Sequence, residues 1–259
     1  MKMGQASIGL IRTLKLKRSL RNLDALTGVV PDLDTQDLRG LRKQARGITE
    51  RANALIRRAE KQLTLEAARD ALIPAPIGSD VRHRTDIWSG PIQPAGVAPA
   101  RRETAVSPEV RLFHDCRNKA VSLRQFENTR EEDIAAYGLQ IDGLDFKGSF
   151  LSLVIAAPKA LVVGLTRDHI LRIETIVECE RDQHISVRMN VKNGPNTEQV
   201  DRPLRLEGTT LAAEFDLSYT PMKENRTDEV WFDVFLGDME MNSIRIRDLY
   251  MSRRLRSEI

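Results

Sequence analysis

The side chains best suited to binding a ligand lie in two short stretches, ISVRMNV and EVWFDVFL. In both stretches apolar and polar residues alternate with a period of two, which is typical of half-buried strands in antiparallel sheets. The residues that this alternation turns away from the core are Arg188, Asn190, Trp231 and Asp233. An aromatic face can stack on a sugar ring while guanidinium, amide and carboxylate groups bind its hydroxyls. These four are our candidate ligand contacts; the alternative is a solvated face with weak cross-strand ion pairs.

A polar loop, KNGPNTEQV, follows the first stretch. Asn-Gly and Pro-Asn both favour turns, and Asn-Gly is a strong signal for a hairpin. Asn196 and Glu198 add hydrogen-bonding side chains beside this turn. We include both as candidate ligand-binding residues that complete the site at a sheet edge, and a purely structural turn is the alternative.

Two further stretches, LRIETIVECE and SIRIRDLY, alternate in the same way. Their outward residues include Arg172, Glu174, Glu178, Arg245 and Arg247. If all these strands adjoin, one sheet presents carboxylates, guanidiniums, an amide and a tryptophan together. An alternative function follows from this arrangement: a carbohydrate-active enzyme in which Glu174, Glu178 or Asp233 acts as acid and base.

Other catalytic and cofactor signals are weak. The sequence His114-Asp115-Cys116 brings together residue types used in nucleophilic catalysis, without a third group to orient them. The four histidines and two cysteines show no metal-ligand spacing, and no glycine-rich phosphate loop is present. We therefore expect no catalytic residue, no metal and no cofactor, and we favour a non-enzymatic role.

From Glu109 onward, short alternating runs separated by turn residues predict a mainly β fold, an antiparallel β-sandwich or jelly roll. A short helical turn is expected within 158–168. We expect strands near residues 109–114, 120–126, 136–142, 149–156, 170–180, 184–192, 199–206, 210–218, 229–236 and 243–251.

Residues 1–70 predict a basic helical arm. Residues 1–63 contain 14 Lys and Arg against 6 Asp and Glu, although the net charge of the whole chain is only +3. The first helix is basic and amphipathic, which favours contact with an anionic membrane surface or another anion. The residues predicted to make this contact are Lys2, Arg12, Lys15, Lys17, Arg18 and Arg21. The alternative is a helix packed on its neighbour with these side chains in water.

A second helix follows Pro31, with Asp34 or Thr35 as its cap, and runs to about Leu63. Its apolar residues recur every three and four positions, which is the spacing of a coiled-coil seam. These residues are Leu38, Leu41, Ala45, Ile48, Ala52, Leu55 and Ala59. The 38–59 seam predicts either an α-helical hairpin with the first helix or a coiled-coil contact with a second copy of the chain.

Residues 71–108 predict a Pro-rich linker or strap between the arm and a β-sandwich domain at 109–259. Six of the chain's 11 prolines lie between positions 74 and 108. Trp88 stands alone among polar residues there. We interpret it as an anchor that pins the strap to the sandwich, with ligand stacking as the alternative.

The sequence favours a cytoplasmic location, including the inner membrane surface for the arm. No apolar run approaches the 18–20 residues that span a bilayer, and the basic start does not resemble a secretory signal. The two cysteines fit a reducing compartment. Residues 64–259 contain 26 Lys and Arg against 31 Asp and Glu, which argues against nucleic acid as a partner.

From about Leu112 onward, the motifs LFHDC, GSFLSLVI, VRMNVKNGPNTEQ, EFDLSYT and IRIRDLYMSRRLR resemble an uncharacterised alphaproteobacterial domain-of-unknown-function family. This resemblance covers about residues 112–259, leaves the N-terminal helices outside and implies no activity, cofactor or catalytic residue. The strand pattern also looks like that of jelly-roll carbohydrate-binding modules.

Together these features predict a non-enzymatic binding or scaffold protein. Its sandwich binds a glycan or a protein, and its arm contacts an anionic membrane surface or a second copy. A carbohydrate-active enzyme and a purely structural assembly protein are the alternatives.

Overall fold

The computed structural model describes residues 17, 21–70, 73–220, 222 and 227–256, with the side chains of 53, 54 and 56–70 excepted. The chain divides into two compact units, Met1–Arg58 and Ala59–Ile259. In the described part of the chain, every helix is too short or too polar to span a bilayer.

The described part of the first unit is helical. Residues 21–29 form a helix, η1 (Val30–Asp32) follows, and α2 (Thr35–Asp70) begins after Asp34. The carboxylate of Asp34 accepts a hydrogen bond of 2.8 Å from the backbone N–H of Asp37, which caps α2. The seam residues Leu38, Ile48 and Leu55 are 37%, 46% and 66% exposed. The apolar side of α2 is therefore open to solvent where its side chains are described.

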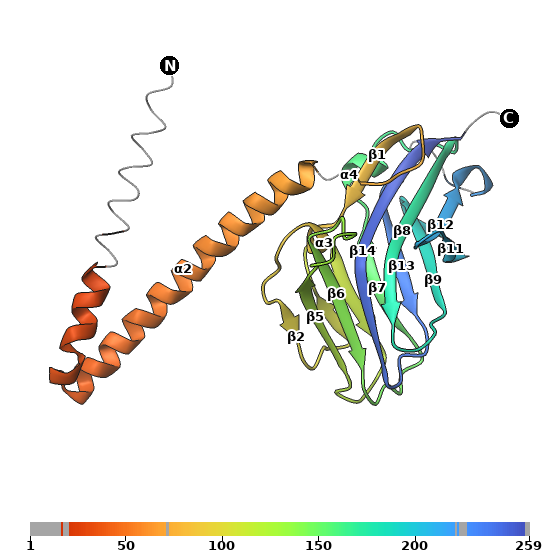
Figure 1. Ribbon diagram of the computed structural model, residues 1–259. Coiled ribbons are helices and arrows are strands. Elements are labelled where there is room, and N and C mark those ends of the chain that lie inside the picture. Colours follow the sequence, from red (N-terminus) through yellow and green to blue (C-terminus); the bar gives the residue numbers. More distant parts are fainter. Residues whose placement is uncertain (1–16, 18–20, 71–72, 221, 223–226, 257–259) are drawn as a thin grey trace, which may run out of the picture. The chain divides into compact units, whose positions relative to one another are not determined.

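The second unit is a sandwich of two antiparallel sheets, with β14 and β8 in front of β13 and β9 in Figure 1. Sheet A has the order β11-β12-β8-β14-β6-β5-β2, with β1 also paired to β14. Sheet B has the order β10-β9-β13-β7-β4-β3. The predicted mainly β fold is confirmed. We call the side of each sheet that faces away from the other sheet its outer face.

The strands of sheet A are β1 (Ser79–Arg84), β2 (Gly96–Val97), β5 (Val121–Glu127), β6 (Tyr137–Gly143), β8 (His169–Cys179), β11 (Arg205–Glu207), β12 (Thr210–Asp216) and β14 (Asn242–Leu255). The strands of sheet B are β3 (Glu103–Ala105), β4 (Val110–His114), β7 (Leu151–Ala156), β9 (Ile185–Asn193), β10 (Asn196–Pro203) and β13 (Thr227–Leu236). The short helices of this unit are α3 (Asp86–Ser89), α4 (Lys159–Val162) and η2 (Leu217–Tyr219).

Alternation along the strands builds a core of mainly aliphatic side chains between the sheets. On β13, Val230, Phe232 and Val234 are buried, while the residues between them are only partly buried. Phe232 meets Phe215 of β12 with ring centroids 5.8 Å apart, which ties sheet B to sheet A. Burying this apolar surface is the main driving force for the sandwich.

The predicted strap at 71–108 belongs to the sandwich itself. Its strands β1, β2 and β3 pair with β14, β5 and β4, respectively. Trp88 of α3 is fully buried, and its indole N–H donates a hydrogen bond of 3.1 Å to the carbonyl oxygen of Ile246. The prolines interrupt the segment, so its strands β2 and β3 are short, but these strands still pair with the sheets.

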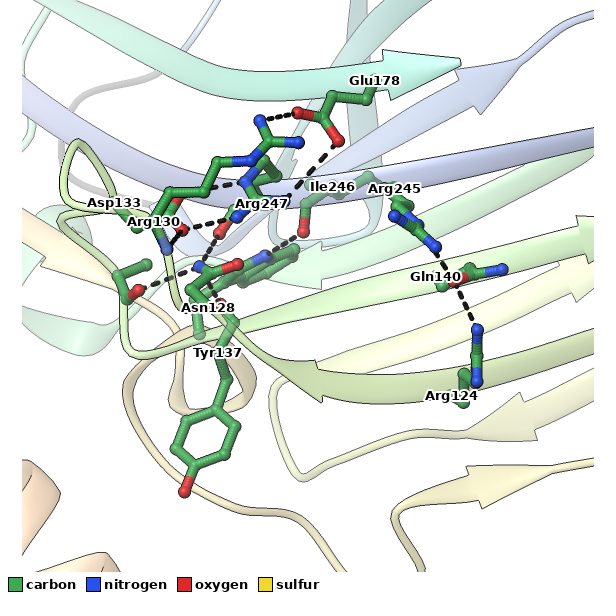
Figure 2. A network of polar contacts seen from close by, with 12 residues as sticks. Arg124, Asn128, Arg130, Asp133, Tyr137, Gln140, Glu178, Arg245, Ile246 and Arg247 are labelled. Atoms are coloured by element: carbon green, nitrogen blue, oxygen red, sulfur yellow. Dashed lines mark hydrogen bonds and ion pairs between the residues drawn. The ribbon is translucent and has the colours of Figure 1, made fainter. Parts of the chain in front are cut away.

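Trp88 fills a gap in sheet A. Along one edge, β14 pairs with β6 up to Ile246 and with β1 from Tyr250 onward. Between these two points the backbone carbonyl of Arg247 accepts a hydrogen bond of 2.8 Å from the side-chain amide of Asn128 (Figure 2). An indole and an amide thus replace the strand partner that β14 lacks there, and the backbone oxygens stay satisfied.

Candidate functional site

Cross-strand pairing brings four predicted ligand contacts together on the outer face of sheet B. Asn190 of β9 lies opposite Trp231 of β13, and Arg188 lies opposite Asp233. Side chains that face each other in this way on antiparallel strands are near neighbours. We call these four residues the β9–β13 face.

Trp231 borders a pocket on this face. The pocket has a volume of about 860 Å³, which is within the range of small-molecule sites. Val154 and Ala156 of β7 also line it; α4 and the turn after it form one wall, and Lys159, Asp228 and Glu229 bring charges to its lining. A half-buried indole beside such a pocket can stack on a flat ligand surface.

The polar groups beside the tryptophan are fixed by a chain of hydrogen bonds. The amide of Gln199 donates to Asn190 Oδ1 at 2.9 Å, and Asn190 Nδ2 donates to Asp233 Oδ2 at 2.9 Å. Asn190 is only 1% exposed. Burial raises the pKa of Asp233 above its ordinary value, and the hydrogen bond from Asn190 offsets only part of this effect.

Arg188 is held by two contacts. Its Nε donates a hydrogen bond of 2.9 Å to Asp201 of β10, and its guanidinium lies 5.2 Å from the ring centroid of Phe235. Phe235 and Trp231 share one face of β13 four residues apart, about 13 Å along the strand. The two aromatic rings therefore flank Asp233.

The loop residues lie on a different side from the four strand residues. Asn196 pairs with Asn193 and Glu198 with Val191, so both share the side of sheet B that faces the core. Gln199 and Asp201 instead face outward beside Asn190 and Arg188. Neither was among our candidate ligand contacts, although Gln199 belongs to the polar loop that the sequence singles out. The signal was available, because a hairpin with Gly194-Pro195 at its centre fixes this register.

The polar residues that we grouped on one sheet lie on two different sheets. Glu174 and Glu178 of β8 and Arg245 of β14 lie on the outer face of sheet A, whereas Trp231 and Asp233 lie on that of sheet B. The condition that all these strands adjoin is not met, because β8 and β14 pair in sheet A and β9 and β13 pair in sheet B. The carboxylate of Asp233 therefore cannot meet those of Glu174 and Glu178 in one cleft.

The two glutamates are already paired with arginines. Glu174 accepts a hydrogen bond of 3.0 Å from Arg172. Glu178 forms ion pairs with Arg130 and Arg247, the latter at 3.6 Å (Figure 2). Among the described residues, no cluster of three or more His, Cys, Asp or Glu side chains is arranged to hold a metal.

The His114-Asp115-Cys116 sequence has a structural arrangement. His114 is 4% exposed and contacts Phe146 edge-on, and burial lowers its pKa. Asp115 holds the turn at Ser149, whose hydroxyl and backbone N–H both donate to its carboxylate at 2.7 Å. Cys116 is a buried free thiol. Asp115 is thus occupied with the turn, and its carboxylate is not used to orient His114.

The predicted membrane or anion contacts are only partly described. Lys17 and Arg21 are exposed. Lys2, Arg12, Lys15 and Arg18 lie outside the described residues.

The fold and the β9–β13 face define a β-sandwich with a candidate binding surface. The chain belongs to a family of unknown function, DUF6478, whose model matches residues 3–259. The resemblance to a family of unknown function is confirmed, and the match extends beyond the expected residues 112–259 to begin at residue 3. No curated protein matches the chain.

Solved structures that match the chain include carbohydrate-binding modules. The CBM22-1 xylan-binding domain of Xyn10C from Paenibacillus barcinonensis is 9% identical with a TM-score of 0.38, over 71% of this chain and 100% of that one. The family 11 module from Clostridium thermocellum, solved with a β-1,3-1,4-mixed-linked tetrasaccharide, is 10% identical with a TM-score of 0.36, over 58% and 92%.

A bacteriophage structure is similar to the same degree. The enzymatically active domain of tailspike protein 4 from bacteriophage CBA120 is 3% identical with a TM-score of 0.38. The match covers 55% of this chain and 19% of the tailspike chain, so this chain spans less than a fifth of that structure's length.

Proposed function

We propose that the protein is a non-enzymatic binding protein whose β9–β13 face binds a glycan. The observation that carries this proposal is the position of Trp231, half-buried at the border of the 860 Å³ pocket with fixed polar groups beside it. The indole offers a stacking surface for the apolar face of a sugar ring. Asp233 and Arg188 offer an acceptor and donors for its hydroxyls.

Fixed polar groups favour binding because little freedom is lost when the ligand arrives. Gln199 donates a hydrogen bond to Asn190, and Asn190 donates one to the carboxylate of Asp233. Asp201 and Phe235 hold Arg188. Neutral oligosaccharides suit this mixture of an aromatic surface with both donors and acceptors. A protein ligand for the same face would need a larger contact area than the pocket provides.

Tryptophan fluorescence tests the proposal on the full chain. The protein has two tryptophans, and Trp88 is fully buried, so a ligand-dependent change in emission should come from Trp231. The chain is screened on a glycan array, and hits are titrated as soluble oligosaccharides. Binding by the variants is compared on the array and by titration calorimetry, which do not use the indole as reporter. We expect saturable binding that Trp231→Ala abolishes, while Tyr219→Ala, which removes a 77% exposed aromatic elsewhere, leaves it unchanged. Unaltered binding by Trp231→Ala would reject this site.

We also propose that the arm joins two copies of the chain in parallel through the 38–59 seam. The apolar seam residues Leu38, Ile48 and Leu55 are exposed on α2, and their three-and-four spacing is that of a coiled coil. In a parallel pair, Asp37 of one helix would face Arg42 of the other across the seam, an attractive match. Such a pairing supports the alternative of a structural assembly protein.

Light scattering on the full chain tests self-association. Ile48→Glu places a charge in the seam and should reduce a dimer to a monomer. Lys43→Glu changes charge on the opposite side of α2 and should leave the mass unchanged. A monomeric wild-type protein at tens of micromolar would rule out the seam as the contact.

For the first helix we propose contact with an anionic membrane surface, based on its basic side chains. Full-length protein is sedimented with anionic or neutral vesicles at low and high salt. Salt-sensitive binding to anionic vesicles alone is expected, weakened by Lys17→Glu with Arg21→Glu. Equal recovery with neutral vesicles, or none with either, would contradict the proposal.

A further inference from the structure

A row of three side chains crosses the outer face of sheet A, opposite to the β9–β13 face. Arg245 of β14 lies opposite Gln140 of β6, and Gln140 lies opposite Arg124 of β5. Gln140 Oε1 accepts hydrogen bonds from both guanidiniums, at 3.1 Å from Arg245 and 2.9 Å from Arg124 (Figure 2). The two donor nitrogens are therefore no more than about 6 Å apart, with a neutral oxygen between them.

Gln140 cannot easily turn away from this position. It is 8% exposed, and its amide nitrogen donates to Asp142 at 2.7 Å and to Ser243 at 3.1 Å. These bonds fix which end of the amide faces the arginines. Asp142 also accepts hydrogen bonds from Ser122 and Ser243. Burial alone would raise the pKa of Asp142, but these hydrogen bonds and nearby Arg124 lower it below its ordinary value.

The carboxylates on the other side of the row are committed elsewhere. Glu178 lies opposite Arg245 across the strands, but its carboxylate pairs with Arg130 and Arg247. Asp133 likewise binds Arg247, with a hydrogen bond of 2.9 Å to its Nε. Within the described ranges, neither Arg124 nor Arg245 forms an ion pair with a carboxylate. Most of their N–H donors thus face solvent.

An aromatic ring orients one of the two guanidiniums. Phe126 of β5 lies across Gly138 of β6, where an added Cβ would overlap its ring. From there the ring centroid lies 5.8 Å from the guanidinium carbons of both Arg245 and Arg247. Cation–π contact and the bond to Gln140 together hold Arg245 in place before any ligand arrives. Among the described side chains, only Gln140 is hydrogen-bonded to the guanidinium of Arg124.

We propose that Arg124 and Arg245 form a binding site for an oxyanion, the carboxylate or phosphate group of a small ligand. Two like charges this close repel each other, and an anion between them would remove that repulsion while accepting charge-assisted hydrogen bonds. The guanidinium fork matches both carboxylate and phosphate geometry. This site is independent of the β9–β13 face, since the two lie on opposite sheets.

Titration calorimetry with the full chain tests the site at constant ionic strength and pH 7.5. The probes are inorganic phosphate and glucuronate, with glucose as the uncharged control. Arg124→Gln and Arg245→Gln each remove one guanidinium from an exposed position. Arg111→Gln, on β4 of sheet B, is the matched control. Thermal unfolding without added oxyanion verifies that every variant is folded.

We expect saturable binding of phosphate, glucuronate or both, and no binding of glucose that depends on Arg124 or Arg245. Either arginine substitution in the row should weaken binding about tenfold or more, as loss of charge-assisted hydrogen bonds would. Arg111→Gln and Trp231→Ala should leave it unchanged, which separates this site from the glycan proposal. Binding of phosphate alone identifies a phosphate group as ligand, and binding of glucuronate alone a carboxylate. No saturable binding, or undiminished binding by Arg124→Gln and Arg245→Gln, would overturn the proposal.

Discussion

Asn190 donates a hydrogen bond of 2.9 Å to Asp233, across strands β9 and β13 on the outer face of sheet B. The donor is buried, and burial raises the pKa of the acceptor. The proposed glycan face thus contains a carboxylate that pays a desolvation cost when it ionises. Burial of this carboxyl, which the hydrogen bond from Asn190 offsets only in part, makes the stability of the sandwich depend on pH.

Asp233→Asn should remove that dependence. A carboxyl whose pKa is raised on folding binds its proton more tightly in the folded state, so its stabilising effect is present below the unfolded pKa of about 3.8–3.9. This stabilisation is lost as the pH rises through the folded pKa. The free energy of unfolding of Asp233→Asn minus that of wild type should therefore be more positive at pH 7 than near pH 4, which means that the variant is relatively more stable at pH 7. Urea unfolding at both pH values measures it. A difference that does not change with pH, or changes in the opposite direction, would contradict the assignment.

Asn128 should be needed where β14 lacks a strand partner. Its Nδ2 lies within hydrogen-bond distance of three carbonyl oxygens, those of Ala135, Tyr137 and Arg247. Asn128→Asp keeps the shape but removes the donor, so buried carbonyls lose their partner at a cost of about 1–3 kcal/mol. Urea unfolding measures this loss. Asn196→Asp, at an exposed position of β10, is the control and should change stability little. Equal stabilities of the two variants would argue against the gap-filling role.

The strands could be predicted from the sequence because the alternation of apolar and polar residues is visible within each short stretch. The predicted runs near 170–180 and 229–236 correspond to β8 and β13. Strand order could not be predicted in this way, since it depends on pairing between strands that are far apart in the sequence, such as β1 with β14 and β7 with β13. For this reason Trp231 and Glu174 were placed on one sheet although they lie on two.

For the candidate site, too, the local features could be predicted and the features that depend on strand pairing could not. The outward direction of Arg188, Asn190, Trp231 and Asp233 is a local property of two alternating stretches. The side of the sheet on which Asn196 and Glu198 lie depends on the hairpin register, which was not worked out from the turn. The placement of Phe126 across Gly138 depends on two strands meeting, and nothing in either local sequence indicates it.

The buried ion pair between Arg84 and Asp248 should be strongly coupled. Both side chains are 3% exposed or less, and the guanidinium binds the carboxylate through two hydrogen bonds of 2.8 Å. Arg84→Met leaves a buried carboxylate whose pKa is already raised by burial despite the arginine. Removing either partner should therefore destabilise the protein by about 3–5 kcal/mol.

A double-mutant cycle by urea unfolding measures the coupling. Arg84→Met with Asp248→Leu replaces both charges by apolar groups and should be less destabilising than the sum of the single changes. The pair Arg111 and Glu103, which is exposed and bonded at 2.9 Å, is the control and should show a coupling of at most about 1 kcal/mol. Additive effects at Arg84 and Asp248 would show that the buried charges are already compensated by other groups.

Gly138 should be needed because the Phe126 ring occupies the space that a side chain would take. Gly138→Ala should force the ring off β6 and destabilise the sandwich by about 1–3 kcal/mol, as overpacking does elsewhere. In a Phe126→Ala background the same substitution should cost much less, because the clash is gone. Thermal unfolding of the four proteins measures this difference. If Gly138→Ala is equally destabilising with and without the ring, the glycine is required by the backbone and not by Phe126. The displaced ring would also release Arg245, so Gly138→Ala should weaken oxyanion binding even in folded protein.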